Sequence, residues 1–249
     1  MTKTFMAPRL YVPFKLIQEA GMQLQPNQSH YLVTVMRCRV GDPITVFNGR
    51  DGEWRAKIVT ASRKLTSIQL CHQVRKQTDE PDVWLLFGIL KQAPLNLMVE
   101  KATELGVSTL CPILTQHTVV RNTSIDRLKS IVLGASEQCG RMTIPDVRPV
   151  KNLEEVVLQW PIERRLFYLD ESGRGIAIAS GLCNNGAGPC AFVIGPEGGF
   201  YKSELDLLAG LPSSTALSLG PRILRAETAA VAALVCWQAL CGDWKRQST

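Results

Sequence analysis

The chain has 249 residues, of which 45% are hydrophobic and 20% are charged, and this composition excludes disordered and fibrous proteins. A domain typically holds about 100–200 residues, so the length predicts one large domain or two modest ones. The net charge of +6 lies in the first 73 residues, where ten Lys and Arg stand against four Asp and Glu, whereas the remaining 176 residues hold 18 of each sign. Such a basic segment is typical of a part that meets a polyanion, although a solvated basic surface would give the same charge.

The first third of the chain predicts a small β-domain. Runs rich in β-branched and aromatic residues, separated by turn signals such as Asn48-Gly49 and Asp51-Gly52, indicate strands at 9–12, 44–47, 53–60 and 65–70. Between the first two strands, apolar residues at helical spacing predict one short helix over 27–36.

A polar stretch that contains a proline, residues 77–82, precedes a change in the character of the chain. After this stretch, apolar runs at 83–89, 109–114, 166–169, 191–194 and 216–219 alternate with helical patterns at 95–105, 124–138, 152–159, 202–209 and 226–240. The alternation predicts a largely parallel sheet flanked by helices. We therefore expect an α/β protein with two domains, residues 1–73 and 74–249.

The cysteines and the apolar segments indicate which classes of protein can be excluded. The eight cysteines form no Cys-x-x-Cys pair, which indicates neither a disulfide framework nor a zinc site, and no metal is expected. The first residues contain no apolar signal segment, and the most apolar run, 229–240, is far shorter than the roughly 20 residues that cross a bilayer. We expect a cytoplasmic protein with reduced cysteines and no membrane span.

Ligands of open α/β sheets bind in loops beyond the carboxyl ends of the strands, so we expect the functional site in the loops after Leu169, Ile194 and Leu219. The loop after Ile194 reads Gly-Pro-Glu-Gly-Gly-Phe and leads into a helix. It matches neither a dinucleotide fingerprint nor a phosphate P-loop, and a tight strand-to-helix turn would use the same residues.

The loop after Leu219 places two arginines, Arg222 and Arg225, around an Ile-Leu pair. Apolar side chains beside backbone donors suit an adenine ring, and fixed guanidinium groups suit a phosphate or a developing anion. Salt bridges from these arginines to Glu227 or Glu197 are a compatible interpretation. A third polar cluster, residues 137–141, ends a helix at the capping residue Gly140, and a solvated helix end would look the same.

Taken together, these segments resemble the signature of the ribosomal small-subunit RNA methyltransferase E family. The two loops match as Ile194-Gly-Pro-Glu-Gly-Gly-Phe200 and Leu219-Gly-Pro-Arg-Ile-Leu-Arg-Ala-Glu-Thr-Ala229. The other matching segments are Lys101-Ala-Thr-Glu-Leu-Gly-Val107, Glu137-Gln-Cys-Gly-Arg141, Arg9-Leu-Tyr-Val12, His30-Tyr-Leu32, Met36-Arg37, Gly41-Asp42 and Phe47-Asn-Gly49. The resemblance therefore runs in order through almost the whole chain.

The resemblance implies an enzyme of the SPOUT superfamily that uses S-adenosylmethionine to methylate N3 of a uridine in the 16S ribosomal RNA of the small subunit. It further implies a PUA-like RNA-binding β-barrel, an α/β domain with a trefoil knot, and a homodimer. General topology rules would not predict a knot. The helix expected at 226–240 is apolar nearly all round, and a dimer interface would account for a second buried face.

The resemblance also implies which residues serve the cofactor, and basic side chains of the first domain are expected to serve the RNA. Those expected around S-adenosylmethionine are Leu169, Gly195, Glu197, Gly198, Gly199, Leu219, Gly220, Ile223 and Leu224. Those expected to contact RNA phosphates, which give salt-dependent affinity, are Arg9, His30, Arg37 and Arg39.

A sulfonium methyl group is already activated, so the enzyme must chiefly align donor and acceptor and remove the N3 proton. We expect Arg225, helped by Arg222 or Arg141, to stabilise the uracil anion. Glu197 or Glu227 is the expected proton acceptor, although Glu227 could equally serve to stabilise a helix N-terminus.

The chain departs from the family at a few positions. Ala226 replaces the usual Thr, and Tyr201 replaces a small hydroxyl residue that would form a capping box with Glu204. Residues 92–97 also depart from the family pattern and receive no role. Two other functions stay open: a SPOUT enzyme that acts on tRNA or on a ribose hydroxyl, and a non-catalytic RNA-binding assembly protein.

Overall fold

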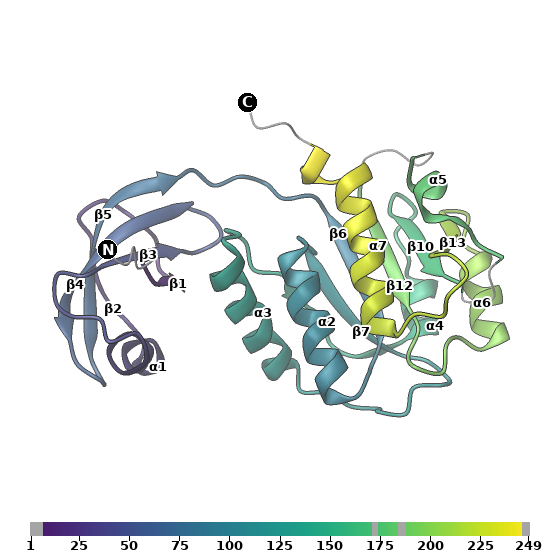
Figure 1. Ribbon diagram of the computed structural model, residues 1–249, viewed down its shortest axis with the longest axis horizontal. Helices are drawn as coiled ribbons and strands as arrows, with labels where there is room; N and C mark the ends of the chain where they lie inside the picture. Colours follow the sequence, from purple (N-terminus) through teal and green to yellow (C-terminus); the bar gives the residue numbers. More distant parts are fainter. Residues whose placement is uncertain (1–6, 171–173, 184–187, 246–249) are drawn as a thin grey trace. The chain divides into compact units, whose positions relative to one another are not determined.

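The computed structural model describes residues 7–170, 174–183 and 188–245, and the chain divides into two compact units (Figure 1). The first unit holds residues 1–79 and 136–144, and the second holds 80–135 and 145–249. Helix α3 (Ile125–Cys139) begins in the second unit, and its last turn belongs to the first. The chain therefore passes between the units three times.

The first unit is built on a five-stranded sheet in the order β1-β3-β4-β5-β2. Strand β1 pairs in parallel with β3, and the other pairs are antiparallel. The strands are β1 (Arg9–Tyr11), β2 (Gly21–Gln23), β3 (Pro43–Phe47), β4 (Glu53–Ala61) and β5 (Thr66–Arg75). Alternate residues of the long strands, such as Ala56 and Ile58 on β4, are buried in one apolar core, as their period of two requires. The four predicted strands are thus confirmed, and the expected domain boundary after residue 73 falls inside β5.

The short helix predicted over 27–36 is present in two parts. It starts as α1 (Pro26–His30), with Pro26 in the first turn, where a missing N–H leaves no hydrogen bond unmade. It continues without interruption as the π-helical turn η1 (Tyr31–Val35), which places Leu32 in the core.

The second unit contains an eight-stranded sheet whose main path is β11-β13-β10-β12-β6-β7-β8, with β9 paired to β7, and every pairing is parallel. The strands are β6 (Val83–Gly88), β7 (Thr109–Leu114), β8 (Asp146–Val147), β9 (Lys151–Asn152), β10 (Arg165–Leu169), β11 (Ile176–Ala177), β12 (Cys190–Ile194) and β13 (Ser214–Ser218). All five residues of the central strand β12 are buried, because helices cover both faces of the sheet.

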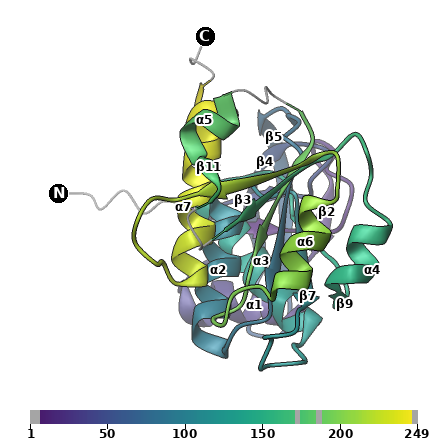
Figure 2. The same ribbon diagram turned by 90° about the vertical axis from the view of Figure 1, so that its right-hand side faces the viewer.

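The helices of this unit lie on the two faces of the sheet. They are α2 (Gln92–Glu104), α4 (Leu153–Leu158), α5 (Ile178–Cys183), α6 (Lys202–Ala209) and α7 (Ala226–Leu240), followed by the 3-10 turn η2 (Asp243–Lys245). Figure 2 shows α2 and α7 along one face and α4 and α6 along the other. No helix in the described ranges is long and apolar enough to cross a membrane.

Candidate functional site

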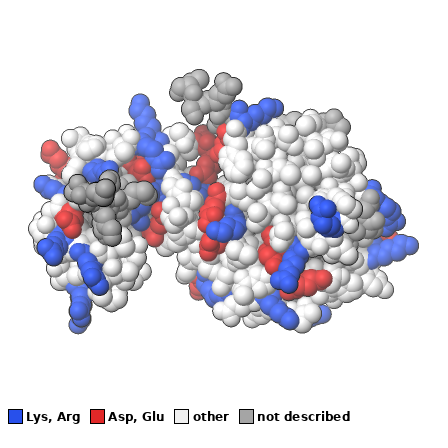
Figure 3. Space-filling model, viewed as in Figure 1, with Lys and Arg blue, Asp and Glu red and all other residues white. Residues whose placement is uncertain are grey.

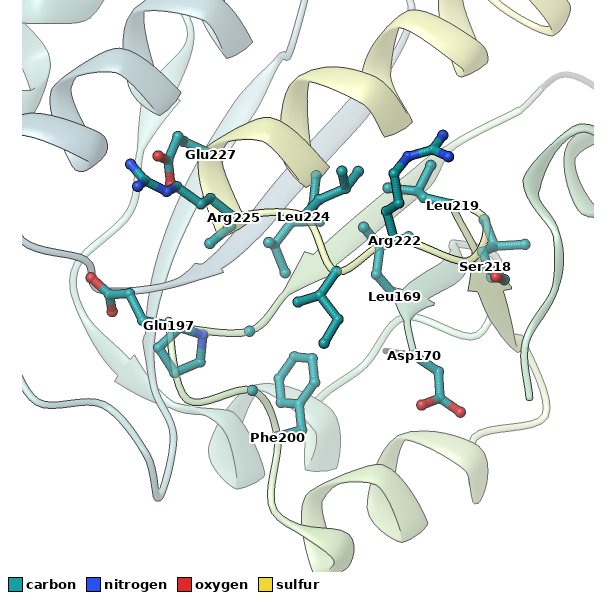
Figure 4. A pocket seen from close by; sticks show the side chains of 18 of the residues that line it. Leu169, Asp170, Glu197, Phe200, Ser218, Leu219, Arg222, Leu224, Arg225 and Glu227 are labelled. Carbon is teal, nitrogen blue, oxygen red and sulfur yellow. The ribbon is translucent and has the colours of Figure 1, made fainter. Parts of the chain in front are cut away.

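Four parallel strands end at one edge of the second sheet. Strands β13, β10, β12 and β6 are direct neighbours, so the loops that follow their carboxyl ends come together. These loops surround a pocket of about 690 Å³ (Figure 4). The position is the one expected for a ligand site in an open α/β sheet.

Eight of the nine residues expected around a cofactor line this pocket. They are Leu169, Gly195, Glu197, Gly199, Leu219, Gly220, Ile223 and Leu224. Gly198 is not among the lining residues. A side chain at Gly198 would instead come within 3.0 Å of Cβ of His117, so this glycine faces away from its pocket-lining neighbours and packs on another loop.

The path of the glycine-rich loop requires glycine at two positions, one on the neighbouring strand β6 and one in the loop itself. A Cβ atom on Gly88, at the end of β6, would lie 2.6 Å from the backbone nitrogen of Pro196, a distance that real Cβ atoms do not adopt. Gly199 has a φ of +68°, in the left-handed region that glycine occupies without strain. The loop therefore lies directly against the end of the neighbouring strand.

The pocket wall carries charges of both signs. Glu197 and Glu227 lie at the same end as Arg225, whereas Asp170 lies at the opposite end (Figure 4). Within the described part of the chain, neither Arg222 nor Arg225 forms an ion pair, so the salt bridges to Glu197 or Glu227 are absent. Both guanidinium groups are exposed and remain available to an anion.

Apolar side chains complete the wall. Leu224 is half-buried and Ile223 is 85% exposed, although the transfer of either apolar side chain out of water would be favourable. Exposed aliphatic side chains beside the turn at Gly220 form a surface that a flat apolar ring can cover.

The sequence-based prediction missed several lining residues, among them Lys91 and Pro94. These two follow β6, whose carboxyl end lies at the same edge as those of β10, β12 and β13. The backbone N–H of Lys91 donates a hydrogen bond of 3.4 Å to Oε1 of Glu197. The rule that selected the other three loops, applied to every strand of the sheet, would have found this fourth loop.

Glu204 holds the start of α6 in place. Its buried carboxylate accepts a 2.8 Å hydrogen bond from the backbone N–H of Tyr201 and another of 2.8 Å from that of Gln116. Replacement of a small hydroxyl residue by Tyr201 was expected to remove the capping box. The hydrogen bond from the residue 201 N–H to Glu204 is nevertheless present, because it needs only the backbone of residue 201.

In the first unit, Arg9 occupies an internal site and not the phosphate-facing one that was expected. Its guanidinium donates to the Glu53 carboxylate and to the carbonyl oxygens of Ser136 and Arg141, the latter two at 2.6 Å. It also lies 3.7 Å from the ring centre of Phe47. These contacts use all three nitrogens of the guanidinium and fasten the last turn of α3 and the segment after it to the sheet.

The ion pair between Arg9 and Glu53 is largely buried, with side-chain exposures of 13% and 9%, whereas Arg75, the second partner of Glu53, is 45% exposed. Burial acts to raise the pKa of Glu53, but hydrogen bonds from Arg75 and Arg9 outweigh it and hold the pKa below its ordinary value. Arg141, an expected catalytic residue, belongs to the same unit and donates to Oγ1 of Thr143 at 3.0 Å. It is not among the residues that line the pocket.

The other residues expected to contact RNA are on the surface of the first unit. His30, Arg37 and Arg39 are all exposed, and Arg37 has a φ of +55°. Figure 3 shows Lys and Arg side chains, in blue, that protrude from the first unit on its left. The positive charge of this segment is therefore available to solvent.

Comparison with known sequences identifies both units. The family described as an RNA methyltransferase domain matches residues 78–238, and the family described as an RNA methyltransferase PUA domain matches residues 24–71. Ribosomal RNA small subunit methyltransferase E of Rickettsia conorii is 32% identical over 231 residues, which cover 91% of this chain and 93% of that protein. The protein of the same name from Synechocystis is 31% identical and covers 94% of this chain and 78% of its own length.

Comparison with solved structures gives the same result for the fold. A crystal structure of a ribosomal RNA small subunit methyltransferase E from Neisseria gonorrhoeae, bound to S-adenosyl methionine, superimposes with a TM-score of 0.89 at 28% identity. The match covers 96% of this chain and 100% of that one. The expected fold class, a PUA-like sheet followed by a parallel α/β domain of the SPOUT type, is confirmed.

Proposed function

The chain belongs to the ribosomal RNA small subunit methyltransferase E family, and from this premise we propose that it transfers a methyl group from S-adenosylmethionine to N3 of a uridine in 16S ribosomal RNA. The observation that carries the proposal is the pocket at the carboxyl edge of the second sheet, where eight of nine expected cofactor residues, Glu197 among them, lie together with Arg225 and Glu227.

The pocket suits S-adenosylmethionine in size and chemistry. Its volume of about 690 Å³ lies within the range of roughly 300–1,000 Å³ that small-molecule sites occupy. Leu219, Ile223 and Leu224 offer apolar surface for the adenine ring, and the glycine-rich loop allows close backbone approach. When bound, the cofactor supplies an activated methyl group on a positively charged sulfur.

The side chains at the Arg225 end of the pocket account for the rest of the chemistry. Negative charge develops on the uracil ring as its N3 proton leaves. This charge is neutralised when N3 takes the methyl group, because the bond between that group and the cofactor sulfur then breaks. Arg225, exposed and without an ion pair among the described residues, stabilises this charge, helped by Arg222, which lines the same pocket. Glu197 or Glu227 accepts the proton.

The first unit supplies affinity for the RNA. Its exposed His30, Arg37 and Arg39 contact phosphates, and this attraction weakens as the salt concentration rises. Arg9 stabilises the unit from within and leaves the phosphate contacts to these three residues.

The active form is a homodimer in the cytoplasm. One face of α7, with Ala229, Ala233 and Trp237, is buried in the second unit. Val231, Ala232 and Val235 recur at helical spacing on another face and are at most half-buried. A second copy of the chain covers this apolar face.

The test is transfer of a labelled methyl group from S-adenosylmethionine to small ribosomal subunits that lack the modification, with tRNA as the competing substrate. We expect label in the small-subunit RNA and none in tRNA. Label in tRNA alone would show that tRNA, and not the small-subunit RNA, is the substrate. Because a ligand that binds the native state must stabilise it, a melting temperature that S-adenosylmethionine does not raise would contradict the proposal that the protein is a methyltransferase.

A further inference from the structure

Two exposed rings stand on the outer side of the glycine-rich loop. The rings of His117 and Tyr201 meet edge to face, with their centres 5.7 Å apart and their planes at 78°. His117 is exposed and Tyr201 is 51% exposed, although the burial of an aromatic side chain is energetically favourable. Neither ring lines the pocket.

The backbone that carries the two rings is held firmly. Glu204 accepts hydrogen bonds from the N–H groups of Gln116 and Tyr201, so one buried carboxylate joins the residue before His117 to Tyr201 itself. The Gln116 side chain adds a 3.1 Å hydrogen bond to Oγ of Ser203. An exposed pair on a fixed backbone loses little conformational freedom when it binds a partner.

The pair lies next to the catalytic end of the pocket. Gly198, whose missing side chain leaves room for His117, stands between Glu197 and Gly199, and both of these line the pocket. Tyr201 directly follows Phe200, another lining residue. A nucleotide beside the one that enters the pocket would therefore meet these rings.

We propose that His117 and Tyr201 form a stacking platform for an unpaired RNA base that flanks the methylated uridine. The inference rests on the proposed function and adds a substrate contact to it. Every base has a flat face that stacks on an aromatic ring, and proteins use such rings to hold bases that have left a helix. The exposed cation of Lys202, next in the chain to Tyr201, suits the phosphate of such a nucleotide.

Tyr201 also offers a well-controlled substitution. Tyr201 is the N-cap residue of α6, and Tyr201→Ser places a favoured N-cap residue there. The variant therefore removes the ring while it retains or improves the cap. Tyr201→Phe retains the ring, and Trp244→Leu removes an exposed aromatic side chain outside both the platform and the pocket lining.

The experiment measures KM for unmodified small subunits, the Kd of S-adenosylmethionine and the melting temperature. For Tyr201→Ser we expect KM to rise on the order of tenfold, the usual scale of one stacked base, with the other two quantities unchanged. Tyr201→Phe and Trp244→Leu should match the wild type. A wild-type KM in Tyr201→Ser would overturn the platform alone, whereas a wild type that transfers no methyl group to subunits would overturn the proposed function and the platform with it.

Discussion

Arg225 is the residue on which the proposed chemistry depends most. It occupies the N-cap position of α7, at the end of the pocket where Glu197 and Glu227 lie, and it forms no ion pair within the described residues. Arg225→Ala should lower kcat by roughly 10²–10³, the usual effect of removing one group that stabilises developing charge. Single-turnover kinetics on small subunits would measure this loss. The Kd of S-adenosylmethionine should change little.

The matched control is Lys129→Ala, which removes an exposed cation from α3, away from the pocket lining. It should retain wild-type turnover. Full turnover in Arg225→Ala, with normal RNA binding, would contradict the role of Arg225.

Glu53 gives the first unit a defined dependence on pH. Its pKa is held below the ordinary value of 4.5, so its contribution to stability is complete above about pH 4.5 and is lost as the pH falls through the folded-state pKa. Glu53→Gln should lower the free energy of unfolding at pH 7 by about 3 kcal/mol, because it leaves two guanidinium groups beside a neutral partner.

Urea unfolding of both proteins at pH 7 and below pH 4 would test this expectation. The difference between wild type and variant should shrink at the lower pH. Glu19→Gln, an exposed change in the same unit, should have no effect at either pH. A difference that is equal at both pH values would contradict the assignment to the Glu53 carboxylate.

Among the elements, the end of β6 controls the position of the glycine-rich loop. A methyl group on Gly88 would lie 2.6 Å from the backbone nitrogen of Pro196, so Gly88→Ala must displace this loop. We expect at least tenfold weaker binding of S-adenosylmethionine by calorimetry, since a displacement of about 1 Å has effects of this size or greater at such sites.

The control is Gly134→Ala within α3, where an added Cβ atom has open space around it. This change should leave cofactor binding unaltered and raise helix stability slightly. Unchanged affinity in Gly88→Ala would show that the loop tolerates displacement.

The predicted and missed elements differ in length and burial. The long strands and helices were predicted because a buried face imposes a period of two or 3.6 on the sequence. The missed elements β2, β8, β9, β11 and α5 have two to six residues, so few of their positions can show a period. Among elements of this length, β1 and α4 were nevertheless predicted.

Much of the site could also be predicted, because the loops that follow parallel strands all lie at the carboxyl edge of the sheet. Arg9 and Gly198 show the limit of this reasoning. A basic residue or a glycine has the same appearance in the sequence whether it faces a ligand or another part of the chain. Only the three-dimensional structure distinguishes the Arg9 contacts with Glu53 and Ser136 from a phosphate contact.

For the whole molecule, the proposed dimer depends on the apolar face of α7. Val235→Glu would place a charge on this face, and burial of an unpaired charge is strongly unfavourable. We expect light scattering to give the mass of a dimer for the wild type and that of a monomer for the variant. Leu158→Glu, on the exposed side of α4, should remain dimeric. A dimeric Val235→Glu would place the interface elsewhere.

The atom of the RNA that receives the methyl group defines the reaction. After reaction with labelled S-adenosylmethionine, the 16S RNA of unmodified small subunits can be digested to nucleosides and analysed by mass spectrometry. We expect the label to appear in a uridine methylated at N3 of the base. Label on a ribose hydroxyl, or on any other base, would contradict the proposed reaction.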